Sequence, residues 1–158
     1  MTLEGRILSP RGFVRGRLHF SERILAVEEA PVEGPYILPG FLDLHVHGGL
    51  GADAMEGKEA VLRMARFHLQ HGTTGLLATT VTAPPEDLRR ALSGIAEAMA
   101  ECEALLGAHL EGPFLSPKRL GAQRPWPQKP DPALMEDPLA RAPVRVVTLA
   151  PELPGALE

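Results

Sequence analysis

His45 and His47 are the residues whose type and spacing first suggest chemistry. They stand two apart at the end of Phe-Leu-Asp-Leu-His-Val-His, an alternating pattern typical of a strand. Residues two apart on a strand point to the same face, so both imidazoles could bind one divalent cation. Asp43 lies one pleat earlier on that face and could orient one of the rings. A histidine pair that only hydrogen-bonds to the following Gly-Gly loop is the simpler alternative.

Glu111 is the next candidate, because it ends a second apolar segment that is predicted to be a strand, Leu105–Glu111. A carboxylate there would supply a hard oxygen ligand on the same face as His109. From the residues alone, an exposed glutamate before a Gly-Pro turn is the simpler interpretation. His109 is expected to pack or to support a ligand rather than to bind a metal itself.

These candidates lie on strands that alternate with helices. The strands are nearly continuous apolar runs, which indicates a parallel sheet. Four such strands could form half of a barrel or a small doubly wound sheet. Polar residues at the carboxyl ends of the first and third strands favour the barrel, whose active sites lie at that end. The expected order is strand 41–47, helix 57–70, strand 74–81, a helix from 84, strand 105–111, loop 112–130, helix 132–140 and strand 144–149.

The first forty residues follow a different pattern, in which short strands are separated by turn residues. The predicted strands are Gly5–Leu8, Phe13–Phe20 and Ile24–Glu28, and Pro31–Pro39 interrupts the pattern. We therefore expect a small β subdomain over residues 1–38 and four β/α units over residues 39–158.

Two longer motifs carry a resemblance to known proteins. Pro-Gly-Phe-Leu-Asp-Leu-His-Val-His-Gly, residues 39–48, resembles the first-strand signature of the amidohydrolase superfamily. Residues 106–123, which contain His-Leu-Glu-Gly-Pro-Phe, resemble the third-strand segment of N-acetylglucosamine-6-phosphate deacetylases. Gly-Thr-Thr-Gly at 72–75 and Val-Thr-Leu-Ala-Pro-Glu at 147–152 support the second resemblance.

The resemblance implies a fold and a site. The fold is α/β: the N-terminal half of a TIM-like (β/α)8 metal-dependent hydrolase barrel, incomplete here, preceded by a small β-sandwich subdomain. Glu111 would bind a divalent metal ion (zinc, iron or similar) together with His45 and His47. Ala122 and Gln123 would contact the sugar, although many members of the family have histidine where Gln123 stands.

The activity implied is hydrolysis of N-acetylglucosamine 6-phosphate, a small phosphosugar, to glucosamine 6-phosphate and acetate by metal-activated water. No catalytic residue is assigned, because the expected aspartate and two further histidine ligands would lie beyond Glu158. We therefore expect this chain to be inactive alone. The alternatives are another amidohydrolase, such as a cyclic amidase, and a non-catalytic half-barrel that binds a metal or a partner.

Composition narrows the remaining possibilities. The net charge is −4 and no basic stripe is present, so nucleic acid is an unexpected partner. The apolar runs are too short for a membrane span. A single cysteine, Cys102, fits the cytoplasm. The excess of arginine over lysine and the lack of asparagine fit a thermophile, although a GC-rich genome would also favour arginine. Four strands would leave open edges, so we expect a homo-oligomer, such as a dimer.

Overall fold

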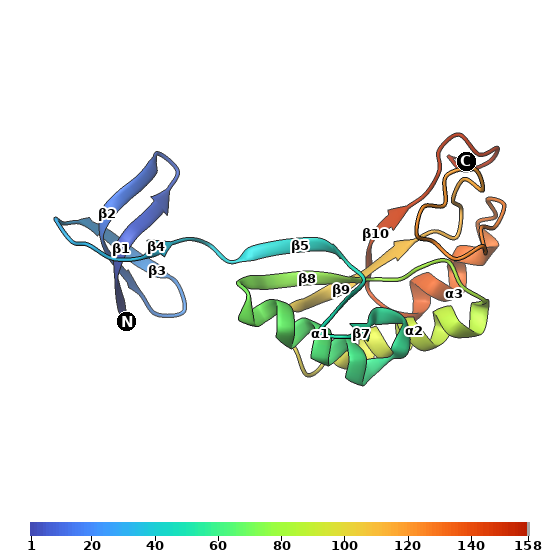
Figure 1. The fold of residues 1–158 in the computed structure, drawn as a ribbon, viewed down its shortest axis with the longest axis horizontal. Coiled ribbons are helices and arrows are strands. Elements are labelled where there is room, and N and C mark those ends of the chain that lie inside the picture. Colours follow the sequence, from blue (N-terminus) through green and yellow to red (C-terminus); the bar gives the residue numbers. More distant parts are fainter. Residues whose placement is uncertain (158) are drawn as a thin grey trace. The chain divides into compact units, whose positions relative to one another are not determined.

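A computed structural model describes residues 1–157 and divides the chain into two compact units, Met1–Gly40 and Phe41–Glu158. Figure 1 shows a β-only first unit and a second unit in which strands alternate with helices. The predicted α/β class with a parallel sheet is confirmed. No helix among residues 1–157 is long and apolar enough to cross a membrane.

The first unit is one four-stranded sheet with the order β3-β2-β1-β4. β1, β2 and β3 form an antiparallel meander, and β4 pairs with β1 in parallel. The expected β-sandwich needs two layers, and the described strands of this unit form a single sheet. The strand bounds are Thr2–Ser9 (β1), Gly12–Phe20 (β2), Ile24–Glu29 (β3) and Tyr36–Ile37 (β4).

The second unit contains a four-stranded parallel sheet with the order β10-β9-β8-β5, so each strand lies beside the next one along the chain. This steady progression is the arrangement of consecutive barrel strands. A small hairpin, β6 with β7, and a 3-10 turn, η1, follow β5. The bounds are Phe41–Val46 (β5), Gly48–Gly49 (β6), Ala52–Asp53 (β7), Ala54–Glu56 (η1), Lys58–Gln70 (α1), Thr73–Thr79 (β8), Pro85–Met99 (α2), Leu105–Glu111 (β9), Ala133–Arg141 (α3) and Val144–Thr148 (β10).

The core lies between the sheet and the helices α1 and α2, which cover one side of it (Figure 1). Met64 of α1, Ile95 of α2 and Leu76 of β8 are fully buried there. The two helices approach closely at Gly94, where an added Cβ would lie 2.6 Å from the Gly57 Cα atom. Packing of this kind fixes the central strands β8 and β9.

The outer strands are less well covered than the central ones. β5 and β10 are the edges of the sheet, and on β5 the side chains of Leu42 and Leu44 are 67% and 53% exposed. The four parallel strands nevertheless direct their carboxyl ends to one edge of the unit. His45, Thr79, Glu111 and Thr148 all lie at or near those ends.

Candidate metal centre

His45, His47 and Glu111 converge at the carboxyl ends of β5 and β9. The Nε2 atoms of His45 and His47 lie 3.2 and 3.0 Å from the same oxygen, Oε2 of Glu111, and 3.0 Å from each other. These side chains meet across β8, which separates β5 from β9 in the sheet. The convergence expected from the sequence is therefore present.

The donor set suits a divalent cation. Ligands about 2.1 Å from a tetrahedral ion stand about 3.4 Å apart, close to the separations found here. Oε2 of Glu111 is buried and has no hydrogen-bond partner within residues 1–157. A buried anionic oxygen with no donor is costly, and a cation bound between it and the two imidazoles would remove that cost.

His47 is held in the orientation that a ligand needs. Its Nδ1 atom lies 3.1 Å from the carbonyl oxygen of Thr79. A carbonyl only accepts, so Nδ1 carries the proton, and in the neutral ring Nε2 keeps its lone pair. That lone pair faces Glu111, which is also an acceptor. Nε2 of His47 and the Glu111 carboxylate therefore need a cation or a proton between them.

Asp43 and His109 form hydrogen bonds to the β5 backbone rather than to the ring nitrogens of the two histidines. The Asp43 carboxylate accepts a hydrogen bond of 3.1 Å from the His45 backbone N–H, so the expectation that it orients a ring is wrong. His109 is buried, with Nδ1 2.8 Å from the Leu44 carbonyl and Nε2 2.7 Å from the Thr148 hydroxyl. Both of its nitrogens are thus occupied, in agreement with a supporting role.

Gln123 and Ala122 lie in the long loop between β9 and α3. The side-chain oxygen of Gln123 accepts a 2.8 Å hydrogen bond from the backbone N–H of Thr82, just after β8. The Thr82 hydroxyl donates over 2.7 Å to the carbonyl of Arg124. Ala122 is exposed. The loop is therefore anchored beside the carboxyl end of β8.

Sequence reasoning missed the threonines of this region. Thr79 and Thr82 are almost fully buried, and both bond to residues that carry or flank the candidate site. The run Thr-Thr-Val-Thr at the end of an apolar strand was the available signal. Hydroxyls at a buried strand end need partners, and such partners are often functional side chains.

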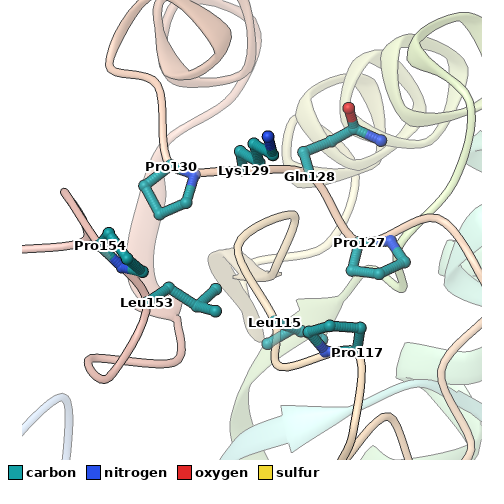
Figure 2. Close-up of a pocket in the computed structure, with 8 residues that line it drawn as sticks. All are labelled: Leu115, Pro117, Pro127, Gln128, Lys129, Pro130, Leu153 and Pro154. Atoms are coloured by element: carbon teal, nitrogen blue, oxygen red, sulfur yellow. The ribbon is translucent and has the colours of Figure 1, made fainter.

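A separate hollow of about 500 Å³ lies between the long loop and the segment after β10. Figure 2 shows that proline rings and leucine side chains form most of its wall, with Lys129 as its charged residue. It includes none of the predicted site residues. Hydrogen bonds from Gln128 N–H to Pro113 O and from Ala150 N–H to Phe114 O, both 2.8 Å, hold its walls together. The histidine–glutamate group, and not this hollow, is therefore the candidate metal centre.

Comparison with known proteins agrees with the motifs. The Amidohydrolase family model matches residues 36–157. The N-acetylglucosamine-6-phosphate deacetylase of Bacillus subtilis (strain 168) is 41% identical over 134 residues, which cover 78% of this chain and 34% of that protein. The resemblance to these deacetylases that the motifs indicated is thus confirmed.

Solved structures give the same result. The crystal structure of N-acetyl-D-glucosamine-6-phosphate deacetylase from Mycobacterium smegmatis has a TM-score of 0.84 and 37% identity, covering 99% of this chain and 49% of that chain. A mutant of that enzyme in complex with N-acetyl-D-glucosamine-6-phosphate has a TM-score of 0.83 and 36% identity, covering 99% and 45%. This chain thus spans about a third to a half of the length of these relatives. Because the family model matches well over half of its residues, the chain belongs to the amidohydrolase family.

Proposed function

We propose that this chain supplies three of the metal-binding residues and part of the sugar-binding surface of an N-acetylglucosamine-6-phosphate deacetylase. The reaction is hydrolysis of the acetamide to glucosamine 6-phosphate and acetate. The convergence of His45, His47 and Glu111 on one point carries the proposal. The similarity to deacetylases over most of the chain supports this substrate over a cyclic amide.

The three residues would hold one divalent cation, which when bound would polarise the acetamide carbonyl and lower the pKa of the attacking water. Mixed nitrogen and oxygen donors suit zinc, iron and similar ions. One carboxylate with two neutral imidazoles neutralises only half of the charge of the ion, so it stays a strong Lewis acid. Thr79 contributes by keeping the proton of His47 on Nδ1, away from the metal.

Gln123 would help to recognise the phosphosugar. Its oxygen is already engaged by Thr82, and this fixes which way the amide faces. The amide nitrogen then offers its two N–H groups as donors to a sugar oxygen. Ala122 would lie against the same sugar from the neighbouring position of the loop.

Other groups would complete the reaction from outside these residues. By the resemblance, they are an aspartate that moves a proton to the leaving amine and two more histidine ligands. The isolated chain should therefore release no acetate. We also propose that it works in the cytoplasm, and that its open β5 and β10 edges favour association into a homo-oligomer.

A chimaera provides the test. Residues 1–157 would replace the matched segment of the Bacillus subtilis deacetylase, and acetate release would be assayed with added zinc or ferrous ion. We expect turnover of N-acetylglucosamine 6-phosphate at about 1–1,000 per second. Glu111→Gln should lower this by at least about 10–100-fold, since loss of a direct ligand costs no less than loss of a residue that supports one.

Three controls define the substrate. The 4-epimer N-acetylgalactosamine 6-phosphate tests whether the configuration of the sugar matters. Unphosphorylated N-acetylglucosamine tests whether the phosphate is required, and dihydrouracil tests whether a cyclic amide is hydrolysed. A folded, metal-loaded chimaera that hydrolysed the cyclic amide but neither acetamido sugar phosphate would contradict the proposal. Acetate release by the isolated, mass-verified chain at the rate of the chimaera would show that no outside group is needed.

A further inference from the structure

The strand that carries the two histidines is irregular beside them. In the pairing of β5 with β8, Asp43 lies opposite Leu76 and Val46 lies opposite Ala78. Three steps along β5 thus match two steps along β8, so β5 has one extra residue, as in a β-bulge. A bulge interrupts the hydrogen-bond ladder and re-aims a side chain, and bulges are common next to active sites.

Side chains, rather than the neighbouring strand, hold the peptide groups of this bulge. The N–H of His45 donates to the Asp43 carboxylate over 3.1 Å. The N–H of Val46 donates to the Thr79 hydroxyl over 2.9 Å. The carbonyl of Leu44 accepts from Nδ1 of His109 over 2.8 Å. His45 therefore sits between two peptide groups that buried side chains fix in place.

Thr79 bonds to the backbone between the two histidines and to the ring of His47. Its hydroxyl accepts from the Val46 N–H, between the histidines, and lies 3.3 Å from the Leu77 carbonyl, to which it donates. Its carbonyl accepts from Nδ1 of His47. Thr79 is fully buried, so water cannot replace these bonds.

His109 secures the other side of the bulge. Its side chain reaches from β9 past β8 to Leu44, and its ring packs edge-on against that of His45, with the ring centres 4.8 Å apart. The Thr148 hydroxyl, 2.7 Å from Nε2, donates to it, since Nδ1 already carries the proton. The ring is thereby fixed from both ends.

We propose that Thr79 and His109 are positioning residues, which lock the β5 bulge so that His45 and His47 present Nε2 to one cation. The proposal rests on the metal site of the proposed function. Without the hydrogen bonds of Thr79 or His109, the two histidines would become ordered only when the metal binds. The entropy cost of that ordering would weaken the affinity for the metal. Loss of residues that orient metal ligands lowers affinity by about 10–100-fold.

The test is a Co²⁺ titration of the 158-residue chain, followed by visible absorption. Thr79→Val should weaken Co²⁺ binding by about 10–100-fold, and Thr79→Ser, which keeps the hydroxyl, should restore it. Thr80→Val is the matched control. Thr80 is equally buried and adjacent, but its hydroxyl has no partner within the described residues, so its loss should leave the affinity unchanged.

His109 provides a second pair of variants if Thr79→Val fails to fold. His109→Asn keeps an N–H donor near the position of Nδ1 and should bind Co²⁺ more tightly than His109→Leu, which has no donor. Equal affinities in this pair would contradict the role of His109.

A metal-free measurement separates the outcomes. Amide hydrogen exchange at Val46 should be slow in the wild type and in Thr79→Ser, and faster in Thr79→Val. If exchange accelerates but Co²⁺ affinity does not change, the bond is only structural and the positioning role is overturned. If the wild type binds no Co²⁺ at all, the metal site of the proposed function fails instead.

Discussion

Substitutions of Gln123 should separate its two expected roles, which are to anchor its loop to Thr82 and to recognise the sugar. Its oxygen accepts from the Thr82 N–H over 2.8 Å, and Thr82 is only 2% exposed. Gln123→Ala would leave that buried N–H without a partner, at a cost of about 1–3 kcal/mol. For a urea dependence of about 2 kcal/mol per molar, the unfolding midpoint of the second unit should fall by about 0.5–1.5 M.

The assay uses the single tryptophan of the chain, Trp126, as its reporter. It lies in the same loop as Gln123, three residues further along. Its fluorescence therefore follows the unfolding of that region rather than that of the first unit. Urea unfolding of the 158-residue chain measures the stability, and kcat/KM of the chimaera measures recognition of the sugar.

Gln123→Glu is the matched variant. It keeps an acceptor for the Thr82 N–H, so its unfolding midpoint should stay near that of the wild type. It loses both amide donors and adds a negative charge beside an anionic sugar phosphate. Its kcat/KM on N-acetylglucosamine 6-phosphate should fall by about 5–150-fold, equivalent to about 1–3 kcal/mol.

Either of two results would refute this reasoning. An alanine variant with the wild-type midpoint would show that the bond to Thr82 does not stabilise the loop. A glutamate variant with wild-type kcat/KM would remove Gln123 from sugar recognition and leave it as an anchor only.

Two further predictions concern packing and charge away from the site. Gly94→Ala should lower the free energy of unfolding in urea by about 1–3 kcal/mol, because the new Cβ would lie 2.6 Å from the Gly57 backbone. The control is Glu97→Ala, on the exposed face of the same helix. Equal stability of the two variants would contradict this prediction. The hydrogen bond from Arg141 lowers the pKa of Asp137 in the folded chain. The ionised carboxylate therefore stabilises the fold when the pH is above the ordinary pKa of an aspartate. This contribution is lost as the pH falls through the lowered pKa of the folded state. Arg141→Gln should raise that pKa in a carboxyl NMR titration, and an unchanged value would show that the pair does not form in solution.

Much of the second unit was predictable, because periodicity determines where its strands and helices lie. The third strand, Leu105–Glu111, has the predicted bounds, and the other predicted elements of this unit differ by a few residues at most, whereas the short hairpin of β6 and β7 and the turn η1 were not predicted. The convergence of His45, His47 and Glu111 followed from placing them at the carboxyl ends of parallel strands. Here the local pattern and the fold agree.

The supporting contacts were not predictable in the same way, because they join residues far apart in the sequence. Val46 and Thr79 are 33 residues apart, Thr82 and Gln123 are 41 apart, and Leu44 and His109 are 65 apart. Strict alternation along β5 also gave no sign of the bulge, which depends on pairing with β8. The first unit shows the same limit. Its first three strands were predicted from the sequence, but β4 and the assembly of the four strands into one sheet were not.

Anomalous diffraction from crystals grown with zinc tests the central claim most directly. We expect one peak about 2.0–2.2 Å from Nε2 of His45, Nε2 of His47 and Oε2 of Glu111. That peak should be lost in the Glu111→Ala variant. Zinc bound only at other residues of a folded chain, with these three atoms left free, would contradict it.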